Sequence, residues 1–163
     1  LLGAGGAARA AAFGLAKEQI SSLIIANRTG DKAQFLADDV SEHIPCVSTI
    51  DLTESHLKKA CINVNLIVNS TSMGMRHSKT EQLSPLTAQI IRPETFVCDM
   101  VYNPIETPLI IEARKAGARV LGGLPMLVYQ GAAAFKHWTG KEAPVEIMFS
   151  SAQNALTNSL HNE

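Results

Sequence analysis

The sequence has few of the residues that would mark a metal site, a disulfide framework or a nucleic-acid partner. Its three cysteines, Cys46, Cys61 and Cys98, form no Cys-x-x-Cys pair, and none of the five histidines stands three or four residues from another. Zinc sites and helical metal sites use those spacings, so we expect no metal and three reduced thiols. The formal net charge of −1 gives no field that would gather nucleic acid or an acidic membrane surface.

Long apolar runs are also missing. No run approaches the roughly 20 apolar residues of a membrane-spanning helix, and no segment resembles a secretory signal. We therefore expect a cytoplasmic protein with a small-molecule partner. With 46% hydrophobic and 18% charged residues, the 163-residue chain has a globular composition and the usual size of one domain, 1–163. It opens on Leu1-Leu2-Gly3, which is typical of the end of a strand, so we expect further chain upstream.

Short apolar runs of the buried-strand kind alternate with helical stretches. The predicted strands are 23–26, 46–48, 66–69, 95–99 and 119–121. Predicted helices cover 7–17, a stretch after Thr29, 109–116, 126–138 and the chain from about 145, with a polar tail at 158–163 that we expect to fray. Such alternation favours an α/β protein, and we predict a three-layer, doubly wound Rossmann-like fold with a mostly parallel sheet.

A glycine-rich turn links the strand-like start to the first helix. Residues Gly3-Ala4-Gly5-Gly6-Ala7-Ala8 fit the pattern G-x-G-x-x-A of dinucleotide-binding folds. The first glycine permits the tight turn, the second lets the backbone approach a pyrophosphate, and Ala8 allows close packing of helix on strand. A Gly/Ala turn that merely lets a helix cross a strand closely is the alternative explanation.

Cationic residues follow the second predicted strand. In an NAD site an acidic side chain at this point accepts hydrogen bonds from the ribose, whereas this chain has Asn27-Arg28-Thr29 and then Lys32. A guanidinium, a hydroxyl and an ammonium suit a 2′-phosphate, so NADP(H) is favoured over NAD(H). Asp31 opposes this preference, and a solvated helix start is the structural alternative for Arg28 and Lys32.

Taken with three later motifs, these features give the chain a resemblance to shikimate dehydrogenases. The later motifs are Asn69-Ser70-Thr71-Ser72-Met73-Gly74, Asp99-Met100-Val101-Tyr102-Asn103-Pro104 and the run 123–130, GLPMLVYQ. The resemblance covers nearly the whole sequence. It implies an NADP-dependent, reversible reduction of 3-dehydroshikimate to shikimate in the aromatic amino-acid (chorismate) pathway, in a two-domain enzyme with the active site in the cleft.

The resemblance also implies roles for individual residues. The pyrophosphate loop would be Gly3, Ala4, Gly5, Gly6 and Ala7, and the adenosine-phosphate site Asn27, Arg28, Thr29 and Lys32. Further cofactor contacts are implied for Thr71, Ser72, Met100, Gly123 and Met126. Tyr102 and Gln130 would reach the substrate. Each of these roles has a structural alternative. Tyr102 would instead anchor the Asn103-Pro104 turn, Gln130 would be a helix residue that faces solvent, and Met126 would fill the core.

None of these residues is a candidate catalytic acid or base. The resemblance places a Lys and an Asp for proton transfer in an N-terminal substrate domain that is absent from this sequence. We therefore expect the chain to bind cofactor with negligible turnover and to need that domain as its partner. A quinate/shikimate enzyme using NAD(H), methylenetetrahydrofolate dehydrogenase, glutamyl-tRNA reductase and a non-catalytic NADP-binding module are the alternatives, and a homodimer stays open.

Overall fold

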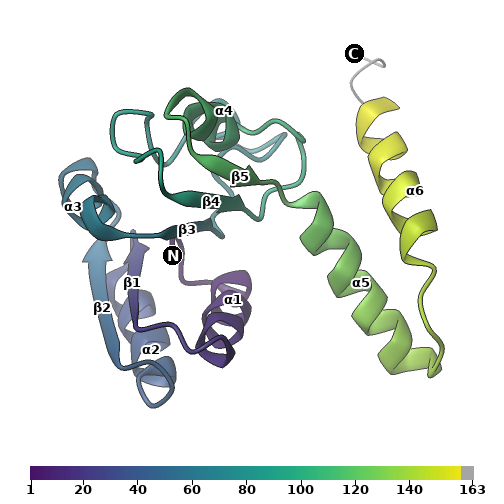
Figure 1. Ribbon diagram of the computed structural model, residues 1–163, viewed down its shortest axis with the longest axis horizontal. Helices are drawn as coiled ribbons and strands as arrows, with labels where there is room; N and C mark the ends of the chain where they lie inside the picture. The colour runs from purple at the N-terminus through teal and green to yellow at the C-terminus, as the bar shows by residue number, and fades with distance from the viewer. Residues whose placement is uncertain (159–163) are drawn as a thin grey trace.

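A twisted parallel sheet forms the centre of the computed structural model, which describes residues 1–158 (Figure 1). Its strands are β1 (Ser22–Asn27), β2 (Cys46–Asp51), β3 (Leu66–Asn69), β4 (Phe96–Asp99) and β5 (Arg119–Leu121). β1 pairs with β2, and β3, β4 and β5 pair in that order, all in parallel. The part of the predicted polar tail at 159–163 lies outside the described residues.

The first two residues of the chain join these two sets of strands. Leu2 forms parallel bridges to Ala26 and to Asn69. Its N–H donates to the carbonyl of Val68 at 2.8 Å, and the N–H of Gly3 donates to that of Ala26 at 2.8 Å. The strand order is therefore β2, β1, Leu1–Leu2, β3, β4, β5, which places the start of the chain in the middle of one continuous sheet.

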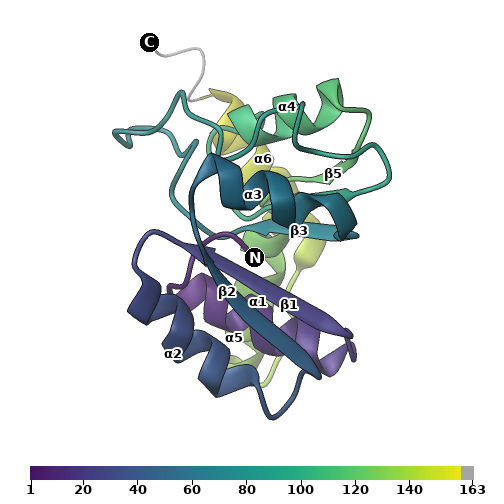
Figure 2. The same ribbon diagram turned by 90° about the vertical axis from the view of Figure 1, so that its left-hand side faces the viewer.

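Helices cover both faces of this sheet. In chain order, the described helices are α1 (Gly6–Lys17), α2 (Gly30–Val40), α3 (Glu54–Ala60), the 3₁₀ turn η1 (Cys61–Asn63), α4 (Pro108–Lys115), α5 (Leu124–Thr139) and α6 (Val145–Asn158). Figure 2 shows α1 and α2 on one side of the strands and α3 and α4 on the other. This arrangement confirms the predicted doubly wound α/β fold.

Each face has its own apolar core. On one face, Leu23 and Ile25 of β1 pack with buried side chains of α1 and α2. Those of α2 are Ala33, Leu36, Ala37 and Val40, the stripe that the sequence predicts. On the other face, Ile67 and Val97 pack against Leu109 of α4 and its neighbours. Apolar residues on both sides of each central strand explain why these strands read as continuous apolar runs.

The last two helices form a hairpin that projects away from the sheet (Figure 1). Val128 is the buried residue of α5, and none of the described side chains of α6 is buried. Tyr129 and Phe149 meet edge to face with ring centroids 5.7 Å apart. The hairpin therefore has contacts within itself but leaves much of its apolar surface exposed.

Three elements differ from the sequence-based prediction. The strand predicted at 46–48 continues to Asp51, since it pairs with β1 along its whole length. The helix α3 and the turn η1 are absent from the prediction, because Leu57 is the buried residue of α3 and gives no periodic pattern. Within residues 1–158, no helix is long and apolar enough to cross a membrane.

Candidate functional site

The residues singled out in the sequence gather at one edge of the sheet. Because the strands are parallel, the loops that follow their carboxyl ends all emerge there, and ligands of open α/β sheets bind in the crevice at that edge. The loops in question are 3–7, 27–32, 70–74, 100–104 and 122–126. The chain order thus places the five motifs beside one another although they lie far apart in sequence.

Gly3 opens the first of these loops. Its φ is +103°, a backbone conformation that favours glycine, and a Cβ there would stand 2.9 Å from Oγ of Ser70. The Ser70 hydroxyl donates to the carbonyl of Leu2 at 2.7 Å, so it is held in that place. Glycine at position 3 is therefore required by the protein itself, through its contact with the loop after β3.

No contact within the protein requires glycine at positions 5 and 6. A Cβ on either would meet no protein atom within 4 Å, and Gly5 has an ordinary φ of −93°. Gly5 is the N-cap of α1 without a side-chain cap, and the first turn of α1 holds no acidic residue. The first N–H groups of a helix lack partners within the helix and attract anions. The open space beside them fits a pyrophosphate group.

The end of β1 supplies a second, cationic part of the edge. Asn27 donates from Nδ2 to the carbonyl of Thr29 at 2.9 Å, which shapes the turn before α2. Arg28 and Lys32 are exposed, and within residues 1–158 neither takes part in an ion pair. Asp31 lies in the first turn of α2 as well. The position offers two cations, with one carboxylate nearby in sequence.

A buried polar network joins the ends of β3 and β4. Asn69 donates from Nδ2 to Oδ1 of Asp99 at 2.8 Å, and Oγ1 of Thr107 donates to Oδ2 at 2.6 Å. The N–H of Val101 also donates to Oδ1, at 3.0 Å. All three side chains of the network, Asn69, Asp99 and Thr107, are fully buried. The carboxyl group thereby fixes two strand ends and, through Thr107, the start of α4.

Burial raises the pKa of Asp99 above its ordinary value. The hydrogen bonds from Thr107, Val101 and Asn69 favour the charged form and offset part of that effect. Asp99 itself faces the interior, so it holds the adjoining residues in place and does not reach the outside of the edge.

The loop after β3 is tied to the same network. Both the N–H and Oγ1 of Thr71 donate to Oδ1 of Asn69, at 3.1 and 2.7 Å. The Thr71 hydroxyl in turn accepts from the N–H of Met73 at 3.2 Å. Ser72, between them, is exposed. Of the two predicted contacts in this loop, Thr71 thus has a structural role and Ser72 is the accessible one.

The loops after β4 and β5 approach each other closely. A Cβ on Gly123 would stand 2.5 Å from the carbonyl oxygen of Met100 and 2.6 Å from that of Val101. Only glycine permits this approach, which sets the start of α5 against the end of β4. Met126 lies partly buried in the first turn of α5. The structure thus brings Met100, Gly123 and Met126 into one region.

Tyr102 lies in the loop after β4, and Gln130 lies farther along α5. Tyr102 is 39% exposed, and Gln130 is exposed on α5, where its Nε2 donates to the carbonyl of Leu127 at 3.2 Å. Both side chains are accessible to a molecule outside the domain.

Sequence reasoning missed Asn69, Asp99 and Thr107 as functional residues. Two polar residues that each end a buried apolar strand, in Leu66-Ile67-Val68-Asn69 and Phe96-Val97-Cys98-Asp99, were the available signal. A parallel pairing in register brings them together.

Comparison with known proteins agrees with this geometry. A family model described as shikimate/quinate 5-dehydrogenase matches residues 1–106, and one described as the shikimate 5′-dehydrogenase C-terminal domain matches residues 123–148. The chain is 45% identical over 157 residues to a shikimate dehydrogenase (NADP(+)) of Moorella thermoacetica, with 96% of this chain and 52% of that protein covered.

Solved structures give the same result. Shikimate 5-dehydrogenase from Thermus thermophilus, in complex with NADP(H) and shikimate, has a TM-score of 0.77 at 36% identity, covering 95% of this chain and 54% of that one. Quinate dehydrogenase from Corynebacterium glutamicum, in complex with NAD, has a TM-score of 0.82 at 29% identity, covering 94% and 53%. The chain thus spans about half the length of these relatives, and it belongs to the shikimate/quinate 5-dehydrogenase family.

Proposed function

We propose that this chain is the cofactor-binding domain of an NADP-dependent shikimate dehydrogenase, which reversibly reduces 3-dehydroshikimate to shikimate. The observation that carries the proposal is the loop Gly3–Gly6. Gly3 is explained by its contact with Ser70, whereas Gly5 and Gly6 face open space at the start of α1. The protein's own packing does not require glycine at these two positions. A pyrophosphate bound at the helix N–H groups does require it.

The residues after β1 support NADP(H) as the cofactor. Arg28 and Lys32 are exposed cations, and the Thr29 hydroxyl stands between them in sequence. Two cations and a hydroxyl favour a 2′-phosphate, which a carboxylate would repel. Asp31 weakens this preference for NADP(H), and the related quinate dehydrogenase structure is a complex with NAD. An NAD-dependent quinate/shikimate enzyme is therefore the second candidate.

When bound, the nicotinamide supplies a hydride for the reduction of a carbonyl group. The chain's own residues would position the reactants. Met100, Gly123 and Met126 meet at the ends of β4 and β5 and would hold the nicotinamide end of the cofactor. Tyr102 and Gln130, both exposed, would contact the substrate. Thr71 and Ser72 would border the cofactor ribose.

The proposed enzyme needs a second domain. The chain spans about half the length of its curated relatives, and none of its motifs assigns a residue to the acid or base of proton transfer. The hairpin of α5 and α6 exposes large apolar side chains, with Tyr129 60%, Trp138 81% and Ile147 65% exposed. Exposed apolar surface of this kind marks an interface. We propose that it packs against a substrate-binding domain of the same protein.

A non-catalytic NADP-binding module would have the same loop, so binding and turnover are tested separately. Titration of the chain with NADPH and with NADH, followed by cofactor fluorescence, should give tighter binding of NADPH. Equal binding of the two would favour the NAD-using branch, and binding of neither would count against a cofactor site. The chain should not reduce 3-dehydroshikimate; turnover by the 163-residue chain would contradict the assignment of the acid and base to another domain. A homodimer and a cytoplasmic location stay predictions.

A further inference from the structure

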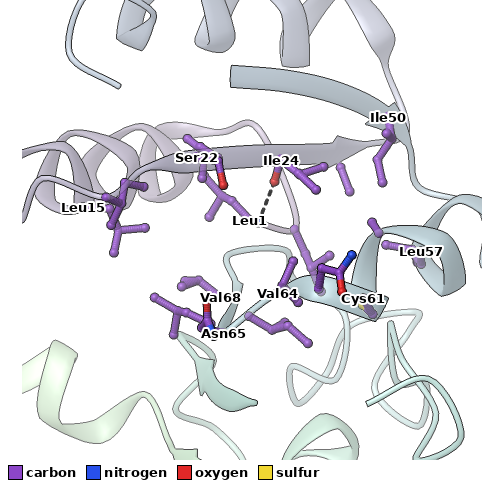
Figure 3. A pocket seen from close by; sticks show the side chains of 18 of the residues that line it. Leu1, Leu15, Ser22, Ile24, Ile50, Leu57, Cys61, Val64, Asn65 and Val68 are labelled. Atoms are coloured by element: carbon purple, nitrogen blue, oxygen red, sulfur yellow. Dashed lines mark hydrogen bonds between the residues drawn. The ribbon is translucent and has the colours of Figure 1, made fainter. Parts of the chain in front are cut away.

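Two buried polar residues face each other across the parallel pair of β3 and β4. Asn69 and Asp99 are register partners at the last positions of their strands, and both are 0% exposed. Asn69 does not line the cavity between β1 and β3 either, although that cavity reaches the adjacent Val68 (Figure 3). Neither side chain of the pair can therefore touch a cofactor or a substrate. Any effect of the pair on binding must pass through other residues.

The side-chain amide of Asn69 is held in one orientation. Its Oδ1 accepts from the N–H and from the hydroxyl of Thr71, at 3.1 and 2.7 Å. Its Nδ2 donates to Oδ1 of Asp99 at 2.8 Å. A backbone N–H can only donate, and a carboxylate can only accept. The amide oxygen must therefore face Thr71, and the amide nitrogen must face Asp99.

The same rule fixes the hydroxyl of Thr71. This hydroxyl accepts from the N–H of Met73 at 3.2 Å, so its own proton goes to Asn69. The bonds from Met73 through Thr71 and Asn69 to Asp99 thus all run in one direction, toward the carboxylate. Hydrogen bonds in such a series polarise one another, and those to a charged group are the strongest. The loop after β3 is therefore held from the interior of the domain.

On its other side, Asp99 fixes the loop after β4. Its carboxylate accepts from the N–H of Val101 at 3.0 Å and from the hydroxyl of Thr107 at 2.6 Å. The Thr107 hydroxyl accepts from the N–H of Ile110 at 3.2 Å, so its proton also goes to Asp99. Every partner of this carboxylate donates to it. The donor that Asn69 supplies is the one that connects the two loops.

We propose that Asn69 is a positioning residue for the cofactor, because it accepts from Thr71 and donates to Asp99. The proposal rests on the function proposed above, in which Thr71 and Ser72 border the cofactor ribose. The bonds to Asn69 turn the Thr71 hydroxyl toward the interior, and Ser72 after it is exposed. A side chain of the same shape that cannot donate to Asp99 would release this loop and weaken cofactor binding without touching the cofactor.

Asn69→Asp makes this requirement depend on a proton. At about pH 8 the variant has two carboxylates face to face in the interior, and neither can donate to the other. One proton taken up by the pair restores a donor, and the new carboxyl group can again accept from Thr71. We therefore expect an affinity for NADP⁺ about tenfold or more below that of the unchanged chain at about pH 8, and within about threefold of it at about pH 6.

A reciprocal exchange separates this role from a simple loss of stability. Asn69→Asp combined with Asp99→Asn keeps one carboxylate and one amide in the pair. The carboxylate at position 69 accepts from Thr71, and the amide at position 99 donates to it and accepts from Thr107. The N–H of Val101 loses its partner in the exchange. The double variant should bind NADP⁺ within about fivefold of the unchanged chain, and this ratio should not change with pH.

Isothermal titration calorimetry with NADP⁺, which is stable in acid, measures the affinity of each chain, and each value is divided by that of the unchanged chain at the same pH. Asn63→Asp adds the same charge at an exposed position of η1 and should leave this ratio near one. Cys98, the titratable neighbour of Asp99 in β4, stays a neutral thiol at both pH values, because burial and the charge of Asp99 raise its pKa.

An affinity ratio for Asn69→Asp that does not change with pH would overturn the proposal. A double variant that binds as weakly as the single one would also overturn it, and this comparison decides if the single variant does not fold at about pH 8. Amide exchange at Met73, measured without cofactor, should be faster in Asn69→Asp and return to normal in the double variant. If the unchanged chain did not bind NADP⁺, the proposed function itself would fall, and this role with it. Normal binding by the unchanged chain identifies a failure of the positioning role alone.

Discussion

The side-chain amide of Asn69 donates to the buried carboxyl group of Asp99 at 2.8 Å, across the paired ends of β3 and β4. Through Thr71 on one side and Thr107 on the other, this pair connects the loop after β3 with the start of α4. Val101, in the loop after β4, also donates to Asp99. The loop after β3, proposed to hold cofactor, and the loop after β4, proposed to hold substrate, therefore share one internal anchor.

Replacing Asp99 by Ala should lower the free energy of unfolding by about 3 kcal/mol or more, because buried donors from Asn69, Thr107 and Val101 lose their acceptor. Asp99→Asn keeps one acceptor oxygen and should cost less. Urea unfolding measures the free energy of unfolding of both variants, and the slope of this free energy against urea concentration should not change. Asp51→Ala, an exposed carboxylate at the end of β2, is the matched control and should change stability little. An equal loss in both Ala variants would rule out the anchor role.

The close approach of two loops at Gly123 gives a second prediction. Gly123→Ala would place a Cβ within 2.6 Å of two carbonyl oxygens, so the start of α5 must move. We expect a loss of about 1 to 3 kcal/mol in the free energy of unfolding, the usual cost of overpacking. At Gly122 the nearest atom is 3.8 Å away, and Gly122→Ala should be close to neutral. Thermal denaturation of the two variants side by side tests this contrast.

Much of the fold could be predicted from the sequence, and the exceptions have physical reasons. The stripe of α2, Ala33 to Val40, lies on one face of a helix long enough to show its period. The short helix α3 buries Leu57 only, so its formation depends on the sheet beneath it and not on a sequence pattern. The strand predicted at 46–48 is too short, since only pairing with β1 extends it to Asp51.

The candidate site divides in the same way. Local motifs predict the glycine loop and the cations after β1, because each consists of residues that are neighbours in sequence. The link between Asn69 and Asp99 spans 30 residues and exists only when β3 and β4 pair in register. The contact of Gly123 with Met100 likewise depends on the arrangement of two separate loops.

The glycines of the first loop should separate stability from binding. Gly5→Ala meets no protein atom, so we expect a change in unfolding free energy within about 1 kcal/mol and a loss of NADPH affinity of at least tenfold. Gly3→Ala, with a φ of +103° and a contact at 2.9 Å, should instead destabilise the fold. Gly14→Ala in α1, also in open space, is the control that should keep both properties. Unaltered NADPH affinity in the Gly5 variant would argue against the pyrophosphate assignment.

Arg28 should decide between the two nicotinamide cofactors. Arg28→Ala removes a cation proposed to contact the 2′-phosphate, and NADPH affinity should fall by about tenfold or more, which corresponds to about 1.4 kcal/mol. NADH affinity should change much less. Lys17→Ala, which removes an equal charge from the far end of α1, controls for the general field of the protein. An equal loss of affinity for NADPH and NADH would mean that Arg28 contacts a part of the cofactor other than the 2′-phosphate.

The buried amino group of Leu1 makes the stability of the 163-residue chain depend on pH. Its pKa falls from 8.0 in the unfolded chain to about 6 in the folded one, because burial disfavours the ammonium. Between these values the unfolded chain binds more protons, so the free energy of unfolding is highest above pH 8 and decreases as the pH falls to 6. Two pKa units correspond to about 2 to 3 kcal/mol. Urea unfolding at several pH values should show this decrease for the free chain and not for its Nα-acetylated form. Coinciding pH profiles of the two forms would mean that the Leu1 nitrogen is not buried.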